Sequence, residues 1–369
     1  MSSKKDKVTI LKILIIKNDG IGDLILSSGI ITFLAKNLCT KLDLLTCIQN
    51  KEIASYIEGI NKFHFVSRDS IKQYSILNIN RIKIPFRKAN DKAKIVRFSI
   101  SEQTTINEIN QENYDLIIVL RRYVRQSSLH LLNNIKAKNK LCMWEYPTNL
   151  SHTSAHELSK DSIHLTSRNL NKFIKTELEY YEAVLSLYFQ QRIHSNPSLT
   201  LKYTNQNPIK KSIGLIICGA SVNISYDKWL KLCEYLIEKN YTVYLFGDKE
   251  QINDAIKIAK ISKNISNFVG QLKFKDYPKI FSSLEFILGN DTGLTHFASL
   301  YNKNVIVLLG GGTFGSFFPW RENEPQKIIY NYLNCYYCLW NCTNENKFQC
   351  ISSLFEKNFI FNQLNKYIP

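Results

Sequence analysis

A carboxylate that directly follows two closely spaced glycines is the first feature of this chain that could do chemistry. Asp23 stands in KNDGIGDLILSS (residues 17–28), after the apolar run ILKILII and before an apolar helical pattern. Gly20 and Gly22 carry no side chains that would cover the carboxylate. A carboxylate exposed in this way can accept a proton from a hydroxyl group as a general base. Capping the N-terminus of the helix that follows is the alternative role.

Two later turns have the composition of phosphate-binding loops. CGAS (218–221) and GNDTGLTH (289–296) each separate a predicted strand from a predicted helix. Glycine lets backbone N–H groups approach a phosphate there, and the start of a helix attracts negative charge. FGDKE places Asp248 and Glu250 after another strand, where they could hold a ribose or a base. Three such strand ends together favour a nucleotide ligand.

Each of these signals also has a plainer structural interpretation. Asp291 would serve as a helix cap, and His296 would be a buried core histidine. A dinucleotide-binding loop is disfavoured, because GIGDLI lacks the third glycine and puts Asp23 where a pyrophosphate would lie.

The elements that must position these residues alternate between strand and helix. The predicted strands are ILKILII, KLDLLTC, KFHFVS, YDLIIVL, SIGLIICGAS, YTVYLFGD, NISNFVGQ, EFILGN and KNVIVLLGGG, with helical patterns between them. This alternation predicts an α/β fold made of two Rossmann-like domains. A polar stretch with two prolines sets the boundary, giving domains 1–205 and 206–369. We expect the ligand-binding edges of the two sheets to face each other across a cleft, and the C-terminal tail to pack back on the first domain.

Length, composition and charge narrow the class of protein. The 369 residues suffice for two domains, and no apolar run approaches the roughly 20 residues that span a bilayer. No small-residue cleavage site follows the basic N-terminus, so we expect a cytoplasmic protein. The formal net charge of +17 favours anionic partners, and a well-solvated basic surface is the alternative. No nucleic-acid-binding motif accompanies this charge, so we expect no nucleic-acid partner.

The densest basic cluster lies between Arg81 and Arg97. It comprises Arg81, Lys83, Arg87, Lys88, Lys92, Lys94 and Arg97, interleaved with apolar residues. Such interleaving is typical of an amphipathic surface more than of a solvated tail.

Four of the nine cysteines cluster near the C-terminus. Cys335, Cys338, Cys342 and Cys350 follow one another at gaps that resemble metal-ligand spacing. A structural zinc is one interpretation, and four free thiols are the other. The remaining cysteines stand in apolar contexts typical of buried thiols.

Several segments together resemble glycosyltransferase family 9, the bacterial heptosyltransferases of lipopolysaccharide core assembly. They are ILIIKNDGIGDLILSSGIITFLAKN, YDLIIVLRRYVRQS, CGASVNISYDKW, YLFGDKEQ, the long segment from NFVGQ to VIVLLGG, and the clustered cysteines. They occur in the family's order, and GNDTGLTHFAS is the most specific of them.

The resemblance implies a GT-B fold and an inverting transfer from a nucleotide sugar, typically ADP-heptose, that needs no metal cofactor. It implies Asp23 as the catalytic base. It implies donor binding by Lys228, Glu250, Asp291, Thr292, Gly293 and His296, to which we add the backbone of Gly219, Ala220 and Ser221. Arg125 matches the family's basic residue for an anionic acceptor, and we expect Gly22 and Arg87 to take part there.

The acceptor implied is an anionic glycolipid, so we expect peripheral contact with the cytoplasmic face of the inner membrane and a monomeric protein. Cys218 stands where the family usually has proline, and GGGTFGSFFPW is unusually rich in glycine. These departures are compatible with a sugar donor other than ADP-heptose. The alternatives are a glycosyltransferase for a different nucleotide sugar and a non-catalytic nucleotide-sugar-binding protein.

Overall fold

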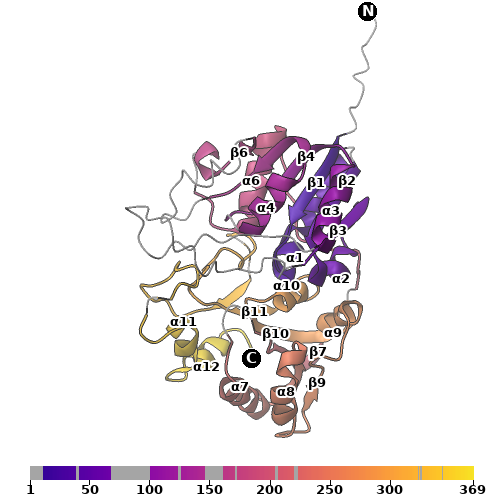
Figure 1. The fold of residues 1–369 in the computed structure, drawn as a ribbon. Coiled ribbons are helices and arrows are strands. Elements are labelled where there is room, and N and C mark those ends of the chain that lie inside the picture. The colour runs from indigo at the N-terminus through magenta and orange to yellow at the C-terminus, as the bar shows by residue number, and fades with distance from the viewer. Residues whose placement is uncertain are drawn as a thin grey trace, which may run out of the picture. The chain divides into compact units, whose positions relative to one another are not determined.

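The computed structural model describes residues 11–38, 41–67, 100–123, 126–145, 161–170, 173–203, 207–219, 223–322, 324, 326–342 and 344–369. Arg87, Arg125, Ala220 and Ser221 lie outside these residues, as does the basic cluster from Arg81 to Arg97. The described chain forms two sheets of six parallel strands each (Figure 1).

The chain divides into two compact units. The first takes its described residues from Met1–Gly20, Ile31–Asn171 and Leu187–Phe189, and the second from Ile21–Ile30, Lys172–Ser186 and Gln190–Pro369. Helix α1 (Ile21–Asn37) therefore contributes its first turns to the second unit. The domain boundary near residue 205 stays a prediction.

The first unit is built on the sheet β3-β2-β1-β4-β5-β6. Its strands are β1 (Lys12–Lys17), β2 (Lys41–Cys47), β3 (Lys62–Val66), β4 (Tyr114–Val119), β5 (Ala137–Cys142) and β6 (Ile163–His164), and its helices are α2 (Lys51–Ala54), α3 (Ile100–Asn110) and α4 (Gln126–Asn134). Strands β1, β2 and β4 are apolar on both faces because the sheet buries them on both sides, as in other parallel sheets.

The second unit is built on the sheet β12-β11-β10-β7-β8-β9. Its strands are β7 (Ile209–Ile216), β8 (Thr242–Phe246), β9 (Ile265–Asn267), β10 (Leu284–Asn290), β11 (Val305–Leu308) and β12 (Lys327–Ile329). Its helices are α7 (Tyr226–Glu238), α8 (Ile252–Ala259), α9 (Tyr277–Ser283), α10 (Gly293–Ser299), α11 (Gln349–Ser352), α12 (Phe359–Leu364) and most of α6 (Glu177–Phe189).

The C-terminal tail packs on the second unit. A contact of this tail with the first domain stays a prediction. Ile360, Leu364 and Ile368 belong to the apolar core of that unit. Phe361 stacks on Tyr235 of α7, with 4.4 Å between the ring centroids. Burial of this apolar face explains where the tail lies.

Several helices differ from their predicted extent. The helix predicted over residues 50–60 is the short α2, which a turn ends before Gly59 at φ +85°. The helix predicted after YDLIIVL corresponds to α4, Gln126–Asn134. Helices α3, α11 and α12 and strands β5, β6 and β12 were not predicted.

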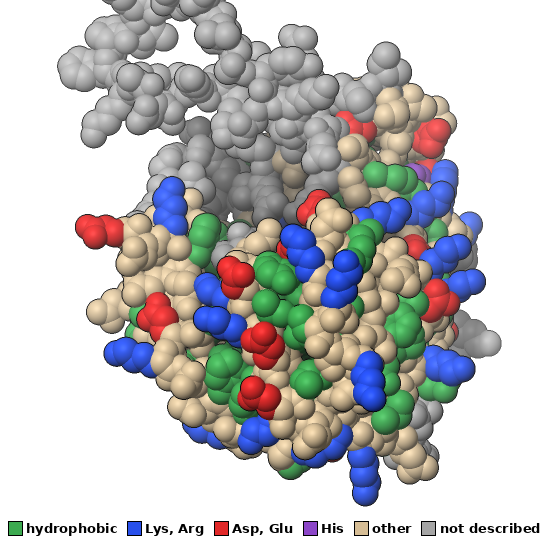
Figure 2. Space-filling model, turned by 90° about the horizontal axis from the view of Figure 1, so that it is seen from below, with side chains coloured by type: hydrophobic (Ala, Val, Ile, Leu, Met, Phe, Trp, Pro, Cys, Tyr) green, Lys and Arg blue, Asp and Glu red, His purple; other side chains and the backbone are tan. Residues whose placement is uncertain are grey.

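None of the described helices is long and apolar enough to cross a membrane. Figure 2 shows one face of the molecule, on which Lys and Arg side chains are scattered among Asp and Glu side chains.

Candidate functional site

The carboxyl ends of three adjacent strands gather the candidate residues of the second unit. Strands β10, β7 and β8 are neighbours in the sheet, and Asp291, Gly219 and Glu250 follow them in turn. Strand β7 has β8 on one side and β10 on the other, so the strand order reverses there. In open α/β sheets a ligand binds outside the carboxyl ends of the strands at such a point.

The first turn of α1 lies against the first turn of α10. A Cβ added at Gly22 would lie 2.8 Å from Cδ2 of His296 and 3.3 Å from Cα of Gly293. Only glycine permits this approach, which explains the missing side chain at position 22. Asp23, half-buried, comes next in this turn of α1, where the helix macrodipole favours a carboxylate.

The ring of His296 is buried and contacted on several sides. The indole N–H of Trp320 donates a hydrogen bond to Nδ1 of His296 at 2.9 Å. The ring of Phe318 stacks on the imidazole, with 4.1 Å between centroids and 17° between planes. Nε2 of His296 lies 3.4 Å from Oδ1 of Asp291, a half-buried carboxylate. The predicted pair Asp291 and His296 is therefore brought together.

Threonine side chains shape the turn between β10 and α10. Thr292 caps α10 by accepting a hydrogen bond from the backbone N–H of Thr295 at 3.4 Å. The hydroxyl of Thr295 donates to the carbonyl of Asn290 at 2.7 Å. The thiol of Cys218 donates to Oγ1 of Thr292 at 3.5 Å, and burial raises the pKa of this thiol to about 12. Cys218 therefore acts as a neutral packing residue beside the turn.

Lys228 lies half-buried in the first turn of α7. Its ammonium group lies 5.4 Å from the centre of the Phe355 ring. Burial lowers the pKa of Lys228, while the charge of Glu356 acts in the opposite direction. Glu250 is exposed in the turn Lys249–Gln251 after β8.

A buried charge cluster in the first unit was not predicted from the sequence. Asp19 bonds to Nη1 of Arg121 and lies 3.0 Å from Nζ of Lys17, and their side chains are 5%, 10% and 1% exposed. Asn18 stands between Lys17 and Asp19 in the sequence, and its Oδ1 accepts a hydrogen bond from the Ser128 hydroxyl at 2.8 Å. The cluster holds the loop between β1 and α1. The sequence signal for this cluster was the presence of charged residues directly after two apolar runs, in KND and in RR.

Trp320, Arg321 and Glu182 were also missed as site residues. Trp320 is the last residue of the glycine-rich segment GGGTFGSFFPW, and Arg321 follows it directly. This segment showed only a departure from the family pattern. Glu182 sits in an ordinary helical pattern and gave no signal.

The C-terminal cysteines do not form a metal site in the structure. Cys335, Cys338, Cys342 and Cys350 are free thiols. In the described part of the chain, no three or more His, Cys, Asp and Glu side chains are arranged to hold a metal ion. The charges of Cys335, Cys338 and Cys342 act on the thiol of Cys350, so the four residues lie in one region of the second unit. The zinc interpretation stays a prediction.

A family model matches a large part of this chain. The model of glycosyltransferase family 9 (heptosyltransferase) matches residues 104–349, more than half of the chain. The chain therefore belongs to glycosyltransferase family 9, a family of enzymes. The match includes GNDTGLTH and begins after KNDGIGD.

Individual relatives are more distant. Lipooligosaccharide heptosyltransferase 2 of Haemophilus ducreyi is 34% identical over 97 residues, which cover 25% of this chain and 28% of that relative. The structure of E. coli ADP-heptose lipopolysaccharide heptosyltransferase II superposes with a TM-score of 0.61 at 15% identity and covers 97% of this chain and 98% of its own. An E. coli heptosyltransferase solved with ADP gives a TM-score of 0.61 at 12% identity, with 97% and 99% covered. The shared fold is GT-B, as predicted.

Proposed function

We propose that this chain is an inverting glycosyltransferase that moves heptose from ADP-heptose onto a lipopolysaccharide or lipooligosaccharide core acceptor. Membership of glycosyltransferase family 9 supports the reaction class, and the names of its relatives support the donor and the acceptor. The single observation that carries the site is the packing of Gly22 on Gly293 and His296. It brings the turn that contains Asp23 beside the proposed donor-binding turn GNDTGLTH.

The proposed step forms one bond and breaks one bond. The acceptor hydroxyl attacks the anomeric carbon while Asp23 accepts its proton. The bond from the anomeric carbon to the diphosphate breaks, and the nucleoside diphosphate leaves with the electron pair. Attack from the opposite face inverts the anomeric configuration.

The charge that develops on the leaving diphosphate needs stabilising groups. We assign this role to Lys228, the hydroxyl of Thr292 and the backbone N–H groups of Gly219 to Ser221 and of Gly293. Asp291, His296 and Glu250 would orient the sugar and the nucleoside. Arg87 and Arg125 would bind the anionic acceptor.

Because the proposed acceptor is a glycolipid, the protein would work at the cytoplasmic face of the inner membrane. We also propose that it works as a monomer. There are two alternatives to this function. In the first, the chain transfers a sugar from a different nucleotide sugar. In the second, it binds a nucleotide sugar without turning it over.

A panel of nucleotides and nucleotide sugars tests the donor. A ligand that binds only the native state raises the melting temperature by mass action, by about 2.7 kcal/mol of stability at one hundred times its Kd. We expect ADP and ADP-heptose to raise it, and UDP and GDP sugars to have little effect. The opposite pattern would assign another donor. Binding of ADP-heptose without transfer to a core acceptor would favour the non-catalytic alternative.

A further inference from the structure

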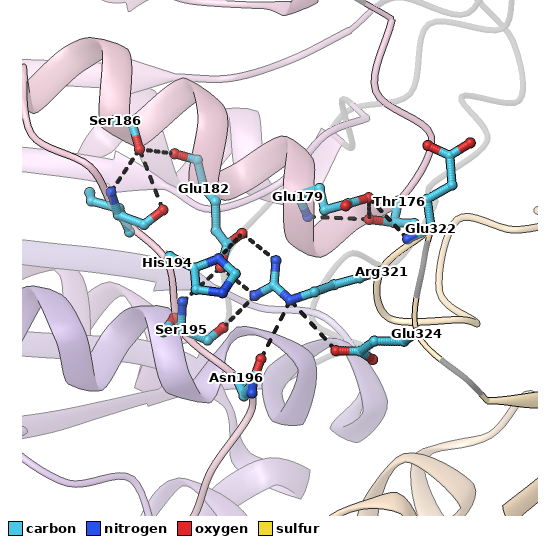
Figure 3. Close-up of polar contacts among 11 residues, drawn as sticks. Thr176, Glu179, Glu182, Ser186, His194, Ser195, Asn196, Arg321, Glu322 and Glu324 are labelled. Atoms are coloured by element: carbon cyan, nitrogen blue, oxygen red, sulfur yellow. Dashed lines mark hydrogen bonds and ion pairs between the residues drawn. The ribbon is translucent and has the colours of Figure 1, made fainter.

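The segment 316–322 lies between the proposed donor turn and helix α6 of the second unit. Three contacts hold it on α6. The backbone N–H of Glu177 donates to the carbonyl of Ser316 at 2.8 Å, and that of Glu322 donates to Oε2 of Glu179 at 3.3 Å. Arg321 makes the third contact, with Glu182 (Figure 3).

The contact between Arg321 and Glu182 is a buried, two-pronged ion pair. Nη1 and Nη2 of Arg321 donate to Oε2 and Oε1 of Glu182 at 2.5 and 2.6 Å. The carboxylate also accepts from the backbone N–H of Ser195 at 2.8 Å, and Nη2 donates to the carbonyl of Ser195 at 3.0 Å. The two side chains are only 12% and 8% exposed. A planar fork of this kind fixes orientation as well as distance.

Trp320 immediately precedes Arg321 and reaches His296. Its backbone N–H donates to Oε1 of Gln326 at 2.7 Å, while its indole N–H donates to Nδ1 of His296. An indole nitrogen can only donate, so the bonded Nδ1 must carry a lone pair. The proton of the neutral ring is then on Nε2, the nitrogen 3.4 Å from Oδ1 of Asp291.

We propose that Trp320 is a positioning residue of the donor site, which fixes His296 in the single neutral tautomer that carries its proton on the side of Asp291. Arg321, held by Glu182, fixes Trp320 in turn. A proton on Nδ1 would face the indole N–H, so the other neutral tautomer is disfavoured. His296 therefore presents its N–H group on the side of Asp291. This inference rests on the proposed function for its catalytic consequence.

The test is Trp320→Phe, which keeps an aromatic ring and removes the N–H. Trp144→Phe is the matched control, because Trp144 is fully buried and its indole nitrogen has no hydrogen-bond partner among the described residues. Nitrogen NMR of full-length protein labelled in histidine reports which ring nitrogen of His296 carries the proton. His296→Gln identifies its signals.

We expect wild type and Trp144→Phe to show one His296 tautomer, protonated on Nε2. Trp320→Phe should show protonation on Nδ1 in part of the molecules. We also expect Trp320→Phe to lower kcat/KM for the nucleotide sugar about 10-fold, as loss of an orienting partner does elsewhere. Trp144→Phe should leave kcat/KM unchanged, even where it lowers the melting temperature as much as Trp320→Phe does or more.

Two results would overturn the proposal. An unchanged tautomer in Trp320→Phe would show that Trp320 does not set it. The second result is a changed tautomer in Trp320→Phe together with the same kcat/KM as in Trp144→Phe. It would show that the tautomer has no role in positioning the substrate. If the wild type turned over no nucleotide sugar, the proposed function would fail, and the NMR comparison alone would decide whether Trp320 fixes His296.

Discussion

Arg321 binds Glu182 through both ends of its guanidinium group, at 2.5 and 2.6 Å, across 139 positions of the sequence. The pair joins helix α6 to the segment that carries Trp320. Because both groups are buried and fully hydrogen-bonded, the pair specifies one arrangement of this segment, and removal of either partner leaves an uncompensated charge.

Arg321→Ala should lower the free energy of unfolding by about 3–5 kcal/mol, because the buried carboxylate of Glu182 would lose its guanidinium partner. Among the described residues, it would keep only the backbone N–H of Ser195 at 2.8 Å and Nδ1 of His194 at 3.5 Å. Arg321→Lys should lower it less, since the charge remains and the fork is lost. Urea unfolding measures both. The control is Lys36→Ala, which removes an exposed pair with Glu58 and should cost at most about 1 kcal/mol. Equal losses for Arg321→Ala and the control would contradict the structural role of the pair.

Asp23→Asn should lower kcat by about 100- to 10,000-fold, because the amide cannot accept the proton of the acceptor hydroxyl. Binding of ADP, followed by calorimetry, should stay close to wild type. Asp254→Asn is the control, since Asp254 is a half-buried carboxylate in the first turn of α8 and loses the same helix-dipole interaction. Full activity in Asp23→Asn would remove Asp23 from the mechanism.

Gly22→Ala should reduce both stability and activity, because the new methyl group would lie 2.8 Å from Cδ2 of His296. Overpacking of this kind costs about 1–3 kcal/mol. The contact is tested by combining the change with His296→Ala, which removes the ring. The stability cost of Gly22→Ala should then largely disappear. A cost that is the same in both backgrounds would mean that the two residues do not touch.

Acid should lower the stability of the first unit by protonating Glu112. Hydrogen bonds from Lys12 and Lys62, with their charges, lower the pKa of Glu112 from 4.5 to about 2. The folded-state pKa is thus below the unfolded one, so the stabilisation is complete above about pH 5 and is lost as pH falls towards 2. The difference in stability between wild type and Glu112→Gln should follow this course, at most about 1 kcal/mol because the lysines are partly exposed.

The control for Glu112 is Glu108→Gln, an exposed carboxylate in α3 that makes no salt bridge within the described structure. Its difference in stability from wild type should be smaller than that of Glu112→Gln at pH 7, because it removes no ion pair. A Glu112→Gln curve parallel to wild type down to pH 2 would refute the assignment.

Cys342 should be the first of the described thiols to react with iodoacetamide. Backbone N–H groups of Phe348 and Asn344 lower the pKa of Cys342, whereas burial raises those of Cys142 and Cys233 to about 12. The thiolate is the reacting form, so rates follow these pKa values and exposure. Peptide mass spectrometry over time measures the order of labelling. Protection of Cys342 that a chelator abolishes would instead indicate a bound metal.

Much of the fold could be predicted because burial leaves a local pattern. YDLIIVL was predicted as a strand and is β4, Tyr114–Val119, since a strand covered on both faces favours a continuous apolar run. Helix α3 was missed because SEQTTINEIN is largely polar and exposes most of its surface. The pair Asp291 and His296 could be proposed because both residues lie in one short motif.

The sequence by itself determined the alternation of strands and helices, the glycine at position 22 and the carboxylate at position 23. These follow from which residue types a strand, a helix or a tight turn accepts. Only the tertiary structure decided that Trp320 bonds to His296 and that Arg321 bonds to Glu182. Hydrogen bonds and ion pairs are directional and short, so their partners are set by where distant segments lie and leave no periodic pattern in the sequence.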